Sequence, residues 1–200
     1  MAIKVILGGP PQSGKTCLKE GLKYAINQIN SQYSSLYPYI ITACPDGEFA
    51  GFQLAFANNP ELAREMKQSY KTIFTEGFVK TRAEWVKNVD LPLTIIDIGG
   101  KVSPENEQIC QYATHAILLA GNLNLLPEWD AFCQKLRLKI IAKLHSDYHA
   151  KEDKLLEKLS DFIYYGSIHH LDRSDLSVRD RPTIKALANI LLEMAIAQTQ

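Results

Sequence analysis

The chain has 200 residues and a mass of 22.5 kDa, which fits one ordinary domain. Its 46% apolar and 22% charged residues are close to globular averages, which disfavours disorder, a collagen-like chain and a disulfide scaffold. Lys and Arg together number 22, as do Asp and Glu, so the formal net charge is zero. We therefore expect no direct binding to nucleic acid and no binding to an anionic membrane surface.

Cysteine usage and apolar runs indicate a soluble, cytoplasmic protein. The four cysteines lie far apart without a Cys-x-x-Cys pair, which predicts buried, reduced thiols; they are Cys17, Cys44, Cys110 and Cys133. Residues 1–4 lead directly into an apolar run without the layout of a signal peptide. No apolar run has the length needed to cross a bilayer, so we expect no membrane partner.

Strand and helix signals alternate along the chain. In chain order they predict a strand over 3–7, a helix over 14–30, a strand over 37–43, helices over about 60–69 and 76–88, a strand over 93–98, a helix starting at 103–104, a strand over 114–120, a helix over 127–137, strands over 138–144 and 162–168, and a closing helix over 182–197. Capping residues support three of the helix starts, at Asn59-Pro60, Thr75 and Ser103-Pro104. Residues 151–158 are mostly charged at helical spacing, and we interpret them as an ordinary exposed face.

This alternation predicts a three-layer α/β domain with a central, mostly parallel sheet. Strands separated by helices pair in parallel through right-handed crossovers, and near-continuous apolar strands fit a sheet covered on both faces. We expect one domain over residues 1–200, with a helical insertion over 45–90 between strands two and three. Ligands of such sheets bind beyond the carboxyl ends of the strands, so the polar residues after each strand are candidates for a site.

A phosphate-binding loop follows the first strand. The segment Gly9-Pro10-Pro11-Gln12-Ser13-Gly14-Lys15-Thr16 fully matches Gly-x-x-x-x-Gly-Lys-Thr, between a predicted strand and a predicted helix. Its glycines let backbone amides wrap around phosphate, and the helix N-terminus adds its dipole. Lys15 is expected to reach the β- and γ-phosphates, and the Thr16 hydroxyl to bind Mg²⁺. With Cys17 as a further contact, the loop predicts a P-loop NTPase fold that binds ATP or another NTP.

An aspartate ends the third apolar strand, as in a Walker B motif. Asp97 is expected to hold Mg²⁺, with a turn aspartate before Gly-Gly as the alternative. Ile98 stands where AAA-type ATPases carry a catalytic Glu, which disfavours an AAA motor. The Asp-x-x-Gly pattern instead lets the Gly100 amide sense a γ-phosphate. Lys101 replaces the water-orienting Gln of Ras-type proteins, and no Asn-Lys-x-Asp supports guanine specificity.

Polar clusters follow the other strands, and each has a structural alternative. Asp46 or Glu48 could orient water, an acceptor hydroxyl or the metal, or belong to a Pro-Asp-Gly turn. His145 and His149 lie four residues apart with Asp147 between them. They could share a helical face, as active-site groups or metal ligands, or Ser146 or Asp147 could cap a helix.

The last polar cluster follows the sixth strand. His169 and His170 begin it, and three arginines follow. Arg173, Arg179 and Arg181 could stabilise phosphate charge as arginine fingers supplied by the same chain, or lie in a solvated loop before the last helix.

In order along the chain, these motifs resemble one family. Gly-Pro-Pro-x-Ser-Gly-Lys-Thr is followed by Ala-Cys-Pro-Asp-Gly-Glu at 43–48, Asp-Ile-Gly-Gly-Lys at 97–101, Ser-Pro-Glu-Asn-Glu at 103–107, Thr-His-Ala at 114–116, His-Ser-Asp-Tyr-His at 145–149 and His-His-Leu at 169–171. They look like the P-loop, AAA-like domain associated with the ring nuclease of type III CRISPR systems. The resemblance implies a role in antiviral signalling and a ring-nuclease partner. Because the chain starts at the P-loop strand, we do not expect the nuclease activity itself.

Three functions remain open. The first is a Mg²⁺-dependent NTPase that uses ATP as a regulatory switch, with Lys15 and Asp97 as catalytic residues. The second is a small-molecule or nucleotide kinase whose helical insertion binds the acceptor and whose Asp46 is the base. The third is a non-catalytic nucleotide-binding interaction module. Homo-oligomerisation is left open by the sequence.

Overall fold

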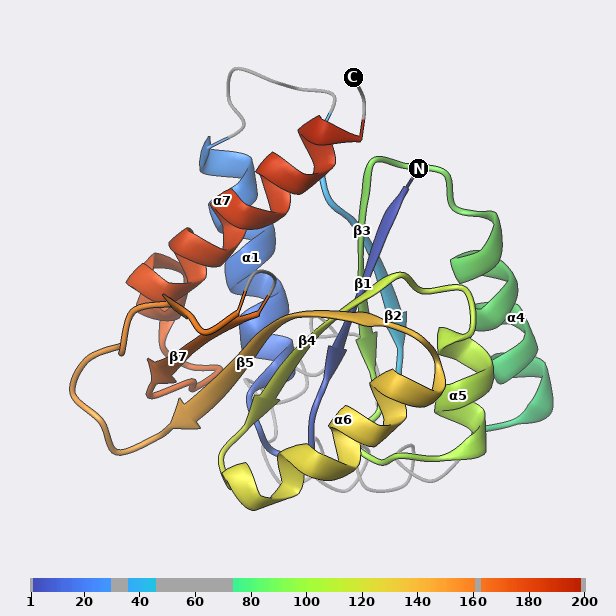
Figure 1. The fold of residues 1–200 in the computed structure, drawn as a ribbon, viewed down its shortest axis with the longest axis horizontal. Coiled ribbons are helices and arrows are strands. Elements are labelled where there is room, and N and C mark those ends of the chain that lie inside the picture. The colour runs from blue at the N-terminus through green and yellow to red at the C-terminus, as the bar shows by residue number, and fades with distance from the viewer. Residues whose placement is uncertain (1, 30–35, 46–73, 161–162, 199–200) are drawn as a thin grey trace.

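The computed structural model describes residues 2–29, 36–45, 74–160 and 163–198. Strands and helices alternate through these residues (Figure 1). In chain order they are β1 (Ile3–Gly8), α1 (Lys15–Ile29), β2 (Tyr39–Ala43), α4 (Glu76–Asn88), β3 (Leu93–Ile98), α5 (Pro104–Cys110), β4 (His115–Ala120), the 3₁₀ helix η3 (Leu123–Leu125), α6 (Leu126–Lys135), β5 (Lys139–Asp147), β6 (Glu157–Lys158), β7 (Tyr164–His169), the 3₁₀ helix η4 (Leu176–Asp180) and α7 (Pro182–Ala197).

The strands form one mostly parallel sheet of seven strands in the order β2-β3-β1-β4-β5-β7-β6. Every pair is parallel except the short β6, which runs antiparallel to β7. In the centre, Leu7 of β1 is in register with Asp97 of β3, and Gly8 with Leu118 of β4. The ends of β1 and β3 are therefore neighbours, and the segments that follow them meet at one edge.

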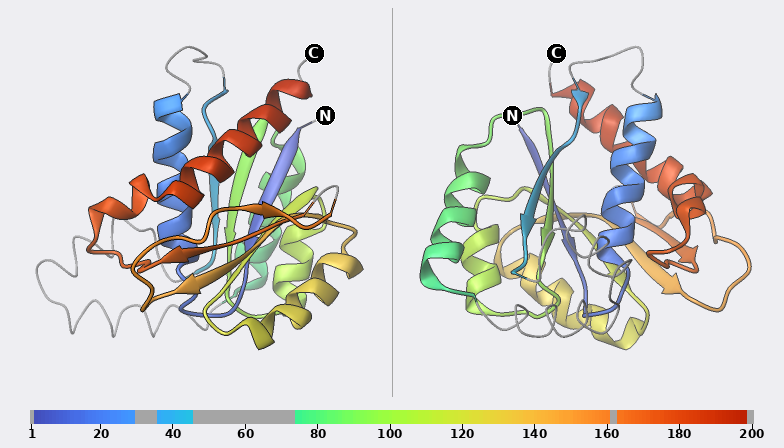
Figure 2. Two further views of the ribbon diagram at one scale, coloured as in Figure 1. Left: turned by 60° about the vertical axis from the view of Figure 1, so that its left-hand side comes forward. Right: turned by 180° about the vertical axis from the view of Figure 1, so that it is seen from behind.

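Helices cover both faces of this sheet, which gives the three layers that the sequence predicts. Figures 1 and 2 show α1 and α7 on one face and α4, α5 and α6 on the other. Successive strand residues point to opposite faces, so Val5 and Leu7 join the α1–α7 core while Ile6 joins the other. The α/β fold and the central parallel sheet are confirmed.

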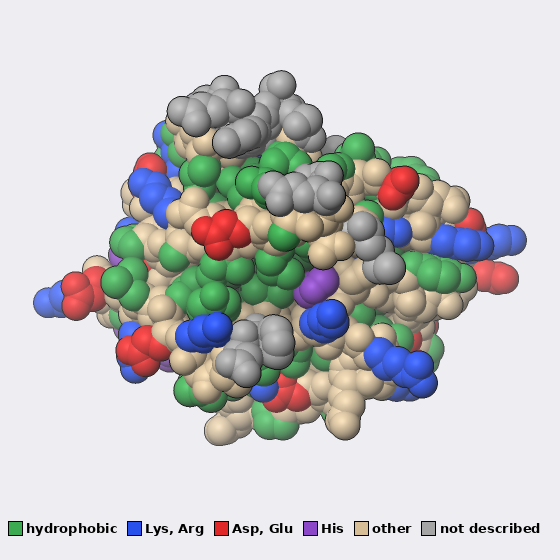
Figure 3. Space-filling view, turned by 45° about the horizontal axis from the view of Figure 1, so that its top comes forward, with side chains coloured by type: hydrophobic (Ala, Val, Ile, Leu, Met, Phe, Trp, Pro, Cys, Tyr) green, Lys and Arg blue, Asp and Glu red, His purple; other side chains and the backbone are tan. Residues whose placement is uncertain are grey.

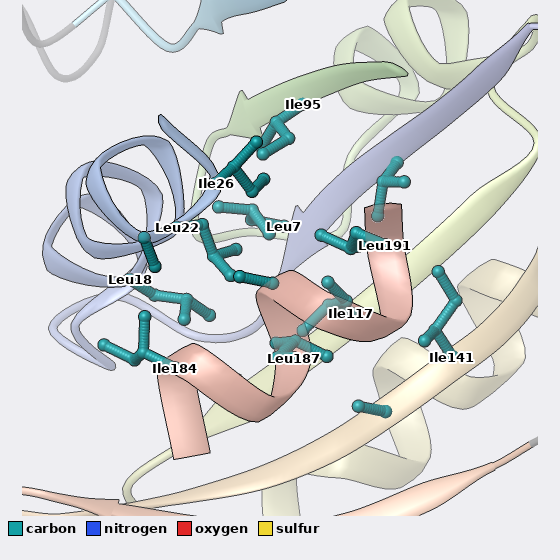
Figure 4. Close-up of a cluster of buried hydrophobic side chains, with 14 of the residues drawn as sticks. Leu7, Leu18, Leu22, Ile26, Ile95, Ile117, Ile141, Ile184, Leu187 and Leu191 are labelled. Carbon is teal, nitrogen blue, oxygen red and sulfur yellow. The ribbon is translucent and has the colours of Figure 1, made fainter. Parts of the chain in front are cut away.

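Packing between α1 and α7 anchors the helix that begins at the phosphate loop. Figure 4 shows the buried side chains of this core, which include Leu18, Leu22 and Ile26 from α1, Ile184, Leu187 and Leu191 from α7, and Leu7, Ile95, Ile117 and Ile141 from the strands. Each such side chain stabilises the fold by about 1.5–3 kcal/mol when fully buried. The loop between β1 and α1 is thus attached to two well-packed elements.

Helix caps follow the predicted chemistry. Thr75 caps α4 by accepting a hydrogen bond from the Phe78 N–H, and Ser103 caps α5 by accepting one from the Asn106 N–H. The predicted helix over about 60–69, and most of the predicted insertion over 45–90, lie outside the described residues. Within that range the structure describes α4 alone as a helix.

The charged segment 151–158 is mostly exposed, as predicted, although it does not form a helix. It is irregular up to β6, because Asp153 and Lys154 are tied to β7. The Lys154 N–H donates to Ser167 Oγ, and the His169 N–H donates to Asp153 Oδ1. Strand β5 also continues to Asp147, three residues beyond the predicted end at 144, because β7 pairs with it over that length.

The surface and the cysteines agree with the composition. Figure 3 shows Lys and Arg side chains interspersed with Asp and Glu around a central apolar region on the face in view. Cys17, Cys110 and Cys133 are buried as predicted, whereas Cys44 is half-buried, and none of the four forms a disulfide. Burial raises the pKa of Cys133 to about 12, which keeps this thiol protonated and unreactive.

Among the helices that the structure describes, none has the length and apolar character to cross a membrane.

Candidate nucleotide-binding site

The loop between β1 and α1 is shaped by two glycines with positive φ. Gly9 has φ 141°, and a Cβ there would lie 1.9 Å from the carbonyl oxygen of Leu119 in β4. Gly14 has φ 84°, and a Cβ there would lie 2.7 Å from Leu171 Cδ1. Gln12, at φ 61°, adopts the left-handed region without being a glycine. The two glycines therefore fill positions where both the backbone angle and the space exclude a side chain.

Lys15 lies inside this loop. Its side chain is buried, and Nζ donates to the carbonyl oxygens of Gly9 (2.7 Å) and Pro10 (2.9 Å). Ser13 Oγ donates to the same Pro10 oxygen at 2.9 Å. The loop thus places one ammonium group at its centre, the position from which a P-loop lysine reaches phosphate.

Asp97 is held at the end of β3 beside the loop. Its side chain is 3% exposed, and Oδ2 lies 3.4 Å from Lys19 Nζ. Lys19 is itself 4% exposed and lies one helical turn beyond Lys15, with Glu20 Oε1 also 3.4 Å from Nζ. Lys19 was not among the predicted site residues; its one signal in the sequence was its position four residues after Lys15, on the same helix face.

Thr16 and Asp97 offer the ligand types that Mg²⁺ prefers. Both line the same cavity, and a hydroxyl oxygen with a carboxylate oxygen is a hard-oxygen donor set. Mg²⁺ normally takes one or two protein ligands and completes its shell with water and phosphate oxygens. The residues present therefore fit a nucleotide-bound Mg²⁺.

Gly100 is brought directly against the phosphate loop. A Cβ at this residue would lie 2.7 Å from the Pro11 nitrogen and 2.8 Å from the Pro11 Cα. The backbone after β3 and the backbone of the phosphate loop are therefore in close contact. Gly100 therefore lies against the phosphate loop, and the sensing of a γ-phosphate by its amide stays a prediction.

Asn106, which was not among the predicted site residues, fixes the loop that carries Gly100. Its side chain is buried at 1% exposure in α5, where Nδ2 donates to the carbonyl oxygens of Gly99 (3.2 Å) and Lys101 (2.7 Å). Its Oδ1 is buried and has no hydrogen-bond partner among the described residues. The signal in the sequence was its place three residues after the Ser103 cap, a position whose side chain faces back over the helix start.

One cavity of about 580 Å³ joins these groups, within the size range of small-molecule sites. Its lining contains Pro11, Gln12, Ser13, Gly14, Lys15, Thr16, Cys17, Cys44, Pro45, Phe74, Asp97, Ile98, Gly99, Gly100, Lys101, Asn106, Leu171 and Arg173. Among the predicted nucleotide contacts, Gly9 and Pro10 are not in this lining; their carbonyl oxygens bind Lys15 instead. Asp46, the predicted base, and Glu48 lie outside the described residues.

The three arginines that follow β7 have different surroundings. Arg173 lines the cavity. Arg181 pairs with Asp175 at 2.9 Å, and the Arg179 guanidinium lies over the ring of Tyr24, 4.5 Å from its centroid. Neither Arg179 nor Arg181 is in the cavity lining, so Arg173 alone of the three is placed to meet a ligand there.

The His145–His149 pair does not share a helical face. His145 lies in β5, and Asp147 Oδ1 accepts hydrogen bonds from the backbone N–H groups of His149 and Ala150. The segment is therefore a strand followed by a turn, because β5 continues along β7. His145 and Asp147 instead line a second cavity, of about 670 Å³, with side chains of both charges. No three His, Cys, Asp or Glu residues group as metal ligands within the described ranges.

His169 and His170 have structural partners. His169 Nδ1 lies 2.6 Å from Oδ1 of the buried Asp153, whose Oδ2 accepts from the Thr183 N–H at the start of α7. His170 stacks on Tyr148, with ring centroids 4.6 Å apart. These contacts join β7 to α7 and to the turn after β5, outside the phosphate-loop cavity.

Comparison with known proteins identifies the fold class. No protein-family model matches the chain, and no curated protein matches its sequence. A solved plasmid partition protein from Borrelia burgdorferi B31, bound to AMPPNP, is similar with a TM-score of 0.56 and 11% identity, over 99% of this chain and 100% of that one. A nucleotide-binding protein from Archaeoglobus fulgidus in complex with ADP has a TM-score of 0.49 and 10% identity, over 92% of this chain and 88% of that one.

The chain has the α/β fold of P-loop nucleotide-binding proteins. The whole-length likeness to the partition protein shows the fold, and the Gly-x-x-x-x-Gly-Lys-Thr loop lies at its β1–α1 junction. Neither similar structure is described as a CRISPR-associated protein.

Proposed function

We propose that this protein binds ATP with Mg²⁺ and hydrolyses it as a nucleotide-dependent switch. The observation that carries the proposal is the convergence of four groups on one cavity. Lys15 and Thr16 come from the phosphate loop, while Asp97 and Gly100 come from the end of β3. This is the combination that P-loop NTPases use for phosphate, Mg²⁺ and the γ-phosphate.

Each residue has a defined task in this proposal. The Lys15 ammonium would leave the carbonyl oxygens of Gly9 and Pro10 for the β- and γ-phosphates. Thr16 and Asp97 would hold Mg²⁺, which when bound neutralises phosphate charge and orients the γ-phosphate. The Gly100 N–H would donate to a γ-phosphate oxygen, so the loop after β3 would respond to hydrolysis.

Asn106 would couple a movement of the loop after β3 to helix α5. It binds the carbonyl groups on both sides of Gly100, and it belongs to α5. Helix α5 in turn packs beside α4. A shift of Gly100 would therefore reach the α4–α5 layer, where a partner could detect the nucleotide state.

A kinase is the second candidate, and the apolar residues in the cavity lining support it. Cys44, Pro45 and Phe74 extend the lining beyond Asp97 toward the β2 side of the sheet. An acceptor molecule could occupy this half-apolar end, next to the γ-phosphate. Asp46, the proposed base, directly follows Pro45 in the sequence. A binding module without catalysis is the third candidate, because Lys101 replaces the water-orienting Gln of Ras-type proteins.

Calorimetric titration with ATP and with GTP, in Mg²⁺, tests nucleotide binding. We expect ATP to bind, and Lys15→Ala to weaken binding by about 100-fold, since charge-assisted hydrogen bonds to phosphate are lost. Lys23→Ala is the matched control, because Lys23 lies two turns further along α1 and outside the cavity lining. Equal affinities of the Lys15 and Lys23 variants would contradict the proposed site.

A ring-nuclease partner is a further part of the proposal, supported by the motif resemblance alone. Co-purification of the two proteins, compared with and without a non-hydrolysable ATP analogue, tests it. We expect association that depends on the nucleotide, and association equal in both conditions would contradict a switch.

A further inference from the structure

The structure contains a buried lysine beside Asp97, the carboxylate proposed to hold Mg²⁺. Lys19 Nζ lies 3.4 Å from Asp97 Oδ2, and both side chains are less than one-twentieth exposed. A buried ammonium is costly without an anionic partner. Asp97 is thus an ion-pair partner in addition to its proposed role as a metal ligand.

We propose that Lys19 is a positioning residue that competes with Mg²⁺ for Asp97 and so weakens the Mg²⁺ dependence of nucleotide binding. This inference rests on the proposed function, in which Asp97 holds Mg²⁺. Two cations that share one carboxylate in a site of low polarity repel each other strongly. Mg²⁺ can therefore bind fully only when the Lys19 ammonium moves away from Asp97.

Glu20 gives Lys19 a second position. Its Oε1 is also 3.4 Å from Lys19 Nζ, and its side chain is 36% exposed. A small rotation of the lysine side chain toward Glu20 would keep its charge paired while Asp97 is released. Lys19 would then alternate between a buried carboxylate at the site and a more exposed one beside it.

The arrangement also changes nucleotide binding without Mg²⁺. An Asp97 carboxylate beside the phosphates would repel them, and the Lys19 charge offsets that repulsion. Lys19 therefore favours the metal-free complex and disfavours the Mg²⁺ complex. Both effects reduce the factor by which Mg²⁺ tightens nucleotide binding.

The test compares the Kd of AMPPNP in EDTA with that in saturating Mg²⁺ by calorimetry, and uses the ratio of the two. The ratio cancels any general loss of affinity or folded fraction. Lys19→Met is expected to raise the ratio by about tenfold, within the usual range of coupling between ligands. Glu20→Gln, which removes the second position, is expected to lower it about threefold. Lys23→Met, on the same helix outside the cavity, should leave it unchanged.

The outcomes separate this inference from the proposed function. Absence of AMPPNP binding in the wild-type protein would contradict the proposed function. Binding with equal ratios in wild type and both variants would overturn the inference, because a merely structural ion pair changes stability alone. Should Lys19→Met fail to fold, the ratio for Glu20→Gln decides: a lowered ratio supports the inference and an unchanged one overturns it.

Discussion

Gly100 and Pro11 are in direct backbone contact, so that a Cβ at residue 100 would lie 2.7 Å from the Pro11 nitrogen. Because the neighbouring atoms are backbone, they cannot yield as a flexible side chain would. We expect Gly100→Ala to separate the two loops and to weaken ATP binding by about 5- to 150-fold, which corresponds to an overpacking cost of about 1–3 kcal/mol. Calorimetric titration measures the ATP affinity of the variant and of the wild-type protein.

Gly77→Ala is the matched control for that prediction. A Cβ at Gly77, in α4, has nothing within 4 Å. We expect unchanged ATP affinity, and stability that is unchanged or raised by up to about 1 kcal/mol. If Gly100→Ala binds ATP as well as Gly77→Ala does, the contact with Pro11 has no part in the site.

Asn106 is expected to hold the loop after β3 in place. Asn106→Ala removes its two hydrogen bonds to the carbonyl oxygens of Gly99 and Lys101 and leaves those groups unpaired. We expect a loss of about 2 kcal/mol in the free energy of unfolding, measured by urea denaturation. Asn88→Ala removes an exposed hydrogen bond to Glu84 and should cost less than about 0.5 kcal/mol. Equal losses for the two variants would show that Asn106 does not stabilise the loop.

The cavity arginine gives a third prediction. Arg173→Ala is expected to weaken ATP binding by about tenfold, because a charged cavity group is removed. Arg179→Ala is the control, since Arg179 lies over Tyr24 outside the cavity lining. A comparable loss in both variants would indicate a long-range charge effect instead of a contact.

His115 makes stability depend on pH. Burial, and then the charge of Lys139, lower the pKa of His115 from its ordinary 6.5. The folded state therefore favours the neutral ring. This contribution to stability is present above the unfolded pKa and is lost as the pH falls through 6.5 toward the lower folded pKa.

Thermal unfolding at pH 7.5 and pH 5.5 tests the His115 prediction. We expect the loss of Tm between these pH values to be smaller in His115→Gln than in the wild-type protein. His149→Gln, in the turn after β5, controls for the substitution itself. An equal loss of Tm in His115→Gln and wild type would contradict the prediction.

The sequence predicted the strands, the helix starts and the phosphate loop because the signals for these features are local. Apolar runs marked the strands, Thr75 and Ser103 marked helix starts, and the glycine spacing marked the phosphate loop. Asp97 could be placed beside that loop because parallel strand ends meet at one edge of a sheet.

The missed features depend on contacts between distant segments. Nothing near Lys19 in the sequence indicates that its ammonium reaches Asp97, 78 residues away. The three arginines after β7 look alike locally, and tertiary partners alone separate Arg173 from the others. Pairing with β7 likewise decided that β5 continues through His145 to Asp147, where the His-x-x-x-His spacing suggested a helix.

Phosphate release from ATP in Mg²⁺ measures hydrolysis itself, with wild-type protein and Asp97→Ala assayed side by side after both are shown to be folded. We expect release above the buffer rate in the wild-type protein and its loss in Asp97→Ala. Tight ATP binding by the wild-type protein without phosphate release would contradict hydrolysis and favour the kinase or the binding module.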